Sequence, residues 1–146
     1  MTVEEAVSAV AELVSLGPPA PAPQIAAAER RIGVQMPADL VAFYMRANGT
    51  VDHTPVDKGW TRLWMTDEWR PVKTLECGPI YAEIDDAAVI ADYSLESWYY
   101  AVDRQGGVYI VDGLRPPRVV AEGFLEFVKM LVKDEKGLYP RSEEAG

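Results

Sequence analysis

Residues 90–112 read IADYSLESWYYAVDRQGGVYIVD, and this stretch decides the fold. Three runs rich in aromatic and β-branched residues, at 88–93, 98–103 and 108–112, are separated by short polar breaks. Such a pattern is typical of adjacent strands in an antiparallel sheet. The second break, at 104–107, contains the two glycines that a tight hairpin favours. Large apolar side chains fall on both faces of these strands, which predicts that at least part of the sheet is covered on both sides.

Helical patterns lie on either side of this central block. Near the N-terminus, Thr2 and Glu5 have the spacing of a capping box, and an apolar stripe with helical periodicity follows them. A stiff Pro-Ala connector at 17–23 separates this helix from the next. The helices expected from apolar periodicity cover residues 2–16, 24–32, 37–48 and 123–135.

Shorter extended elements are expected around the central strands. Residues 61–65 alternate as a strand does, and 69–75 form an edge or irregular strand because Pro71 has no N–H to donate. Residues 80–84 fit a short strand or a helical turn, and 118–121 fit a final short strand. The order of elements predicts the α+β class, with helices packed against a mostly antiparallel sheet of about five or six strands.

Length and composition bound the class of protein. A chain of 146 residues predicts a single domain over 1–146, and 49% hydrophobic with 25% charged residues is typical of a soluble globular protein. No apolar run is long enough to span a bilayer, and the first residues lack the basic start of a signal peptide. The sole cysteine, Cys77, excludes an intramolecular disulfide. These features predict a cytoplasmic protein without membrane contact.

The charge balance is acidic. The chain has 23 acidic and 14 basic residues, a net charge of −9. An acidic surface repels phosphate groups, so we do not expect nucleic acid as a ligand. It attracts a basic protein partner and speeds the encounter with it. The alternative interpretation is that the charge only keeps the protein soluble.

The residues that commonly carry catalysis or bind metals are sparse. Cys77 and His53 are the only residues of their types, and no sequence feature pairs them as a nucleophile and its base. The spacing of Asp52, His53 and Asp57 matches no established metal-ligand pattern. We therefore expect no catalytic residue, no metal and no cofactor. A small enzyme that uses Asp or Glu is the weakest alternative.

A group of aromatic and acidic residues is the candidate partner-binding surface. Trp60, Trp64 and Trp69 flank Asp67 and Glu68. Tryptophan is enriched at the energetic centres of protein interfaces, and carboxylates beside it suit a basic partner. The alternative interpretation is that these tryptophans pack in the core, because large aromatic side chains are mostly buried. Adjacent carboxylates in a strand point to opposite faces, so this pair is not expected to act together in acid–base chemistry.

Four stretches of the chain resemble the SUKH superfamily, which includes bacterial immunity proteins of toxin systems and fungal regulators of cell-wall synthesis. The similar stretches are 25–49, 62–69, 90–103 with 107–109, and 119–131. In the first stretch, the residues at the positions that the family pattern expects are Glu29, Gly33, Pro37, Asp39, Phe43, Asn48 and Gly49. Gly123 departs from the pattern, because Ser or a similar N-cap residue is expected there. Glycine at this position should weaken the start of the helix by only a few tenths of a kcal/mol, roughly.

The resemblance implies a non-enzymatic binding domain. Its bacterial members typically bind and neutralise a cognate toxin domain, often a nuclease, so the implied partner is a toxin protein. The toxin-contacting residues differ between members, so the resemblance assigns no site. The alternative is an intracellular scaffold or regulatory module in cell-wall synthesis or signalling.

Overall fold

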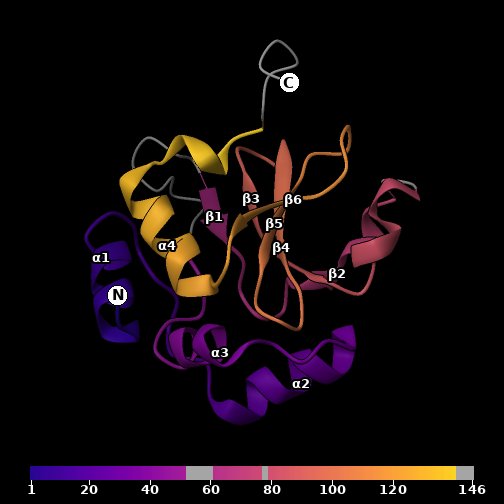
Figure 1. Ribbon diagram of the computed structural model, residues 1–146. Coiled ribbons are helices and arrows are strands. Elements are labelled where there is room, and N and C mark those ends of the chain that lie inside the picture. Colours follow the sequence, from indigo (N-terminus) through magenta and orange to yellow (C-terminus); the bar gives the residue numbers. More distant parts are fainter. Residues whose placement is uncertain (52–60, 77–78, 141–146) are drawn as a thin grey trace.

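The computed structural model describes residues 1–51, 61–76 and 79–140 (Figure 1). Its centre is a six-stranded sheet in which the paired strands are antiparallel, in the order β1-β3-β4-β5-β6, with β2 also pairing with β3. The predicted α+β class is confirmed. The strands are β1 (Thr61–Leu63), β2 (Arg70–Pro71), β3 (Ala88–Tyr93), β4 (Trp98–Val102), β5 (Val108–Val111) and β6 (Arg118–Ala121).

The helices follow the predicted order. In the described ranges they are α1 (Val3–Ala11), α2 (Ala22–Ile32), α3 (Ala38–Tyr44) and α4 (Phe124–Lys133), with the short 3₁₀ helices η2 (Val72–Leu75), η3 (Pro79–Ile84) and η4 (Lys136–Leu138). The capping box at Thr2 and Glu5 is confirmed. Helix α1 ends at Ala11, earlier than predicted, and Leu16, which was expected at its end, instead forms a β-bridge with Thr50.

The structure corrects one prediction of a short strand and decides another. The strand predicted over 69–75 ends at Pro71 and continues as η2, since proline cannot donate to the strand ladder. Residues 80–84 lie in η3, so the helical alternative is the right one. None of the helices in the described ranges combines the length and apolar character needed to cross a bilayer.

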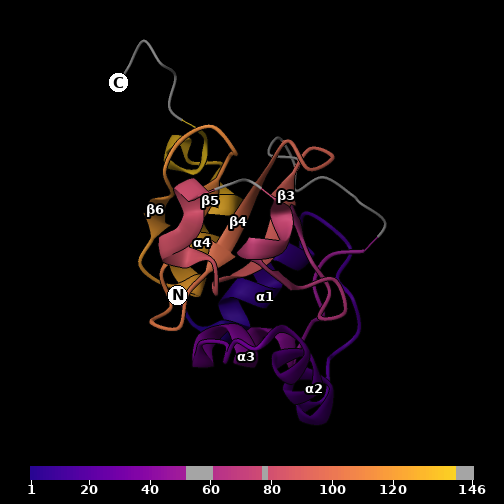
Figure 2. The same cartoon turned by 90° about the vertical axis from the view of Figure 1, so that its right-hand side faces the viewer.

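The sheet is covered on both faces, as predicted. Helix α4, with α1 beside it, lies against one face, and the short helices η2 and η3 lie on the other (Figures 1 and 2). The first five residues of β3 are all buried as a result. Tyr100 of β4 packs against Phe127 of α4, with ring centroids 5.0 Å apart. Because side chains alternate along a strand, its neighbour Tyr99 points to the opposite face.

Asn48 and Gly49 join the end of α3 to the sheet. Gly49 has a φ of +73°, and a Cβ at this position would lie 2.7 Å from the carbonyl oxygen of Trp64. Asn48 is buried, and its Oδ1 accepts a hydrogen bond from the backbone N–H of Thr66 at 2.9 Å. These contacts fix the segment after β1, which carries most of the predicted binding residues.

Helix α4 receives its N-terminal cap from another helix. Gly123 has no side chain to cap it, but Oδ2 of Asp39, at the start of α3, accepts a hydrogen bond from the backbone N–H of Leu125 at 3.3 Å. A carboxylate also complements the positive end of the helix dipole. The glycine that departs from the expected pattern is therefore compensated by Asp39.

Candidate functional site

The structure divides the predicted binding residues between core and surface. Trp64 and Trp69 are only 3% and 2% exposed, so the structure shows them packed in the core, as the alternative interpretation expected, and not presented at the surface. Trp69 packs edge-to-face on Tyr44 of α3, with ring centroids 4.9 Å apart, so it completes the apolar core. Asp67 is exposed and Glu68 is half-buried. Trp60 lies outside the described residues.

A network of charged groups lies at the junction of β1 and β3. The guanidinium of Arg62 donates to both carboxylate oxygens of Glu68 at 2.8 Å. Its other terminal nitrogen, Nη2, lies 3.3 Å from Oδ1 of Asp92. The side chains of Arg62 and Asp92 are 15% and 4% exposed. Such pairing offsets part of the free-energy cost of burying charged groups.

Asp92 connects this network to the turn between β3 and β4. Its Oδ1 also accepts from the indole Nε1 of Trp64 at 2.5 Å, and its Oδ2 accepts from the backbone N–H of Glu96 at 2.9 Å. One buried carboxylate therefore orients an arginine, a tryptophan and a turn. The indole of Trp64 can be buried because its one polar atom, Nε1, donates a hydrogen bond to Asp92.

The outward side of this network carries an arginine between two aromatic rings. The guanidinium carbon of Arg70 lies 5.7 Å from the ring centroid of Trp64 and 5.8 Å from that of Tyr99. These distances are within cation–π range. Glu96 lies 3.9 Å from Arg70, and its Oε1 lies 3.4 Å from the hydroxyl of Tyr99. Arg70, Glu96 and Tyr99 form a surface on the sheet face opposite α4, which we call the Arg70 surface.

The Arg70 surface is accessible and pre-organised. The side chain of Arg70 is 40% exposed and that of Glu96 is 55% exposed. Partial burial, followed by the nearby carboxylate of Glu96, raises the pKa of the Tyr99 hydroxyl above its ordinary value. The Tyr99 phenol is therefore neutral at pH 7, and its O–H donates to the Glu96 carboxylate, which holds the ring in place.

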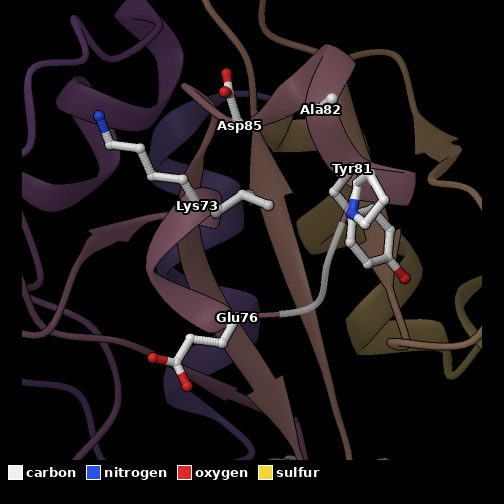
Figure 3. Close-up of a pocket in the computed structure, with 7 residues that line it drawn as sticks. Lys73, Glu76, Tyr81, Ala82 and Asp85 are labelled. Carbon is white, nitrogen blue, oxygen red and sulfur yellow. The ribbon is translucent and has the colours of Figure 1, made fainter.

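A cleft lies on the same side of the molecule as the Arg70 surface, between η2 and η3. This cleft of about 300 Å³ is lined by Val72, Lys73, Glu76, Pro79, Tyr81, Ala82 and Asp85. Figure 3 shows that the carboxylates of Glu76 and Asp85 point in different directions, and the ammonium of Lys73 points outward. The charged groups do not converge on one point in the cleft, as acid–base catalysis on a bound substrate would require.

Metal binding finds no support in the described ranges. No group of three His, Cys, Asp or Glu side chains there could hold a metal ion. The weak candidates from the sequence, Asp52, His53, Asp57 and Cys77, lie outside the described residues.

The sequence did not indicate that Arg70, Glu96 and Tyr99 lie together in one surface. Strand alternation does place Tyr99 opposite Tyr100, which was the one available signal. The contact between Arg70 and Tyr99 depends on β2 and β4 both lying next to β3, which residue spacing does not reveal.

These features define an α+β domain with a polar and aromatic surface on one sheet face. Residues 19–130 match the SMI1 / KNR4 family (SUKH-1). The chain belongs to this family, which confirms the resemblance to the SUKH superfamily. A comparison with curated proteins found no match.

Proposed function

We propose that this protein is a non-enzymatic immunity protein that binds and neutralises a cognate bacterial toxin domain in the cytoplasm. Membership of the SUKH-1 family supports a binding role. The observation that carries the proposal furthest is the Arg70 surface, in which a partly exposed guanidinium lies against the rings of Trp64 and Tyr99. Arginine and tyrosine are enriched among the residues that dominate binding energy at interfaces.

The buried network makes this surface suitable for tight binding. Asp92 fixes Trp64 and the backbone of Glu96, and Trp64 in turn packs against Arg70. Side chains that are already held in place lose little conformational entropy when a partner binds. Binding energy is therefore not spent on ordering the surface.

The charge of the protein favours a basic partner. The net charge of −9 accelerates encounter with a positively charged toxin, such as a nuclease, and this acceleration weakens as salt increases. Glu96 contributes an exposed carboxylate to the Arg70 surface itself, and Asp67, in the segment after β1, is also exposed. Like-charged partners are disfavoured by the same field.

The test is a pull-down from the native host with tagged protein, at low and moderate salt, with bound proteins identified by mass spectrometry. The bait is compared with the double variant Arg70→Ala, Tyr99→Ala. Met45→Ala is the matched control, because Met45 is 47% exposed at the end of α3. We expect a basic toxic domain at near one-to-one ratio, bound less at moderate salt, lost from the double variant and kept by the control.

Other outcomes decide between the remaining classes. Recovery of cell-wall or signalling machinery in place of a toxin would favour a scaffold or regulatory module. Equal recovery of the toxin by the double variant, at unchanged thermal stability, would exclude the Arg70 surface as the contact. Recovery of no protein by the wild-type bait would contradict the proposal and make a substrate screen the next step.

A further inference from the structure

Leu95 is an apolar side chain that does not pack in the core. It lies in the turn between β3 and β4 and is 90% exposed, the highest value among the large hydrophobic residues of the described ranges. A single exposed leucine is ordinary on a protein surface. The backbone on which Leu95 stands is not ordinary.

Three consecutive residues of this turn have the left-handed conformation. The φ angles of Ser94, Leu95 and Glu96 are +43°, +57° and +64°. Residues with a Cβ disfavour this region, and glycine or asparagine would adopt it at lower cost. A leucine in such a turn breaks a local rule without improving packing, and departures of this kind cluster at functional sites.

The surrounding contacts hold the turn in place. The backbone N–H of Ser97 donates to the carbonyl of Tyr93 at 2.8 Å, and the hydroxyl of Ser97 donates to the carbonyl of Ser94 at 2.7 Å. The rings of Tyr93 and Trp98 stack across the base of the turn, with centroids 4.2 Å apart. Together with the bond from Glu96 to Asp92, these contacts present Leu95 on a rigid support.

The neighbours of Leu95 indicate the chemistry of its partner. Glu96, the next residue, is 55% exposed and forms part of the Arg70 surface. The surrounding network has more carboxylates (Glu68, Asp92 and Glu96) than guanidinium groups (Arg62 and Arg70), and the whole chain is acidic. A protein surface complementary to this region has an apolar hollow with lysine or arginine at its rim.

We infer that Leu95 is a binding anchor that inserts into an apolar pocket with a basic rim on the protein partner. The inference rests on the proposed function and adds a residue and a contact chemistry to it. The left-handed turn holds the side chain outward before binding, so the partner does not have to order it.

The test uses two leucines of the same chain. Leu95→Asn removes the apolar side chain, and asparagine tolerates the left-handed region. Leu114→Asn is the matched control, because Leu114 is 81% exposed in the segment between β5 and β6. Both variants and the wild type serve as baits in host lysate, and their thermal unfolding is measured in parallel. Size-exclusion chromatography with light scattering reports the oligomeric state of each.

We expect Leu95→Asn to keep the wild-type melting temperature or exceed it, and to recover at least about tenfold less partner. Leu114→Asn should recover the wild-type amount. Equal recovery by all three baits would overturn the role of Leu95 and leave the proposed function intact. A wild-type bait that captures no protein would contradict the proposed function, and the inference with it. A wild-type dimer that Leu95→Asn dissociates would assign the pocket to a second copy of this chain and overturn the toxin as occupant.

Discussion

The indole Nε1 of Trp64 donates a 2.5 Å hydrogen bond to Oδ1 of Asp92, and both side chains are almost fully buried. The same carboxylate pairs with Arg62 and accepts from the backbone of Glu96. This relationship explains why a tryptophan that seemed suited to contact a partner lies inside the protein, while the arginine stacked on it faces outward.

Replacing Asp92 should therefore destabilise the protein strongly. In Asp92→Ala, the indole N–H of Trp64 and the guanidinium of Arg62 lose a buried partner, and the expected loss is about 3 kcal/mol of unfolding free energy. Chemical denaturation measures this loss. Asp67→Ala is the control, since Asp67 is exposed, and it should change stability by less than about 0.5 kcal/mol. Equal stability of the two variants would contradict the role assigned to Asp92.

Two glycines with the same backbone angle should differ in their tolerance of alanine. Gly33 and Gly49 both have a φ of +73°, but a Cβ at Gly33 would meet nothing within 4 Å. Gly33→Ala should lower the unfolding free energy by about 1 kcal/mol from backbone strain alone. Gly49→Ala should lose about 2 kcal/mol more, because its Cβ would clash with the Trp64 carbonyl. Thermal unfolding of both variants measures the difference, and similar losses would argue against the close approach.

The cap that Asp39 supplies to α4 is open to a double-mutant test. Asp39→Ala should cost about 1 kcal/mol, the usual value of a lost N-cap. Gly123→Ser places a hydroxyl at the N-cap position and should recover most of that loss in the Asp39→Ala background, while adding little to the wild type. Denaturation of the four proteins gives the coupling. Additive effects would show that the two side chains do not cap the same helix end.

Stability should fall at alkaline pH because of buried phenols. Burial raises the pKa of Tyr44 and of Tyr100 well above the ordinary value. Their hydroxyls donate to the carbonyls of Trp64 and Leu138. A phenol whose pKa is higher in the folded state contributes stability that is complete below the unfolded value. That contribution is lost as pH rises above about 10.

A urea denaturation series across alkaline pH measures this loss. Tyr44→Phe should make the decline above pH about 10 shallower than in the wild type. Tyr99→Phe is the control, because Tyr99 lies at the surface and is only partly buried. In this variant the loss of stability caused by the buried phenols Tyr44 and Tyr100 should persist. An unchanged slope in Tyr44→Phe would show that the Tyr44 phenol does not couple to unfolding.

The sheet was predictable because local sequence patterns mark its strands. The runs that became β3, β4, β5 and β6 alternate and end at turn residues, so their bounds agree with the structure to within a residue. The strand predicted over 69–75 was wrong beyond Pro71, since the missing N–H of proline ends the ladder and η2 follows. Both outcomes depend on neighbouring residues along the chain.

The candidate site was only partly predictable because it depends on pairings distant in sequence. Of the predicted residues, Trp64 does contact the Arg70 surface, because the guanidinium of Arg70 lies over its ring. Burial of Trp64 depends on its hydrogen bond to Asp92 of β3, and the position of Arg70 depends on its contact with Tyr99 of β4. Spacing within the chain also gave no sign of the left-handed turn at Leu95, because its sequence is that of an ordinary polar break.

The measurement that tests the central claim most directly is calorimetric titration of the protein captured in the pull-down into wild-type protein and into Arg70→Ala, Tyr99→Ala, at two salt concentrations. The account predicts one-to-one binding of a basic protein, weaker at higher salt, with at least about a tenfold loss of affinity in the double variant. An affinity that neither salt nor the double substitution changes would contradict it.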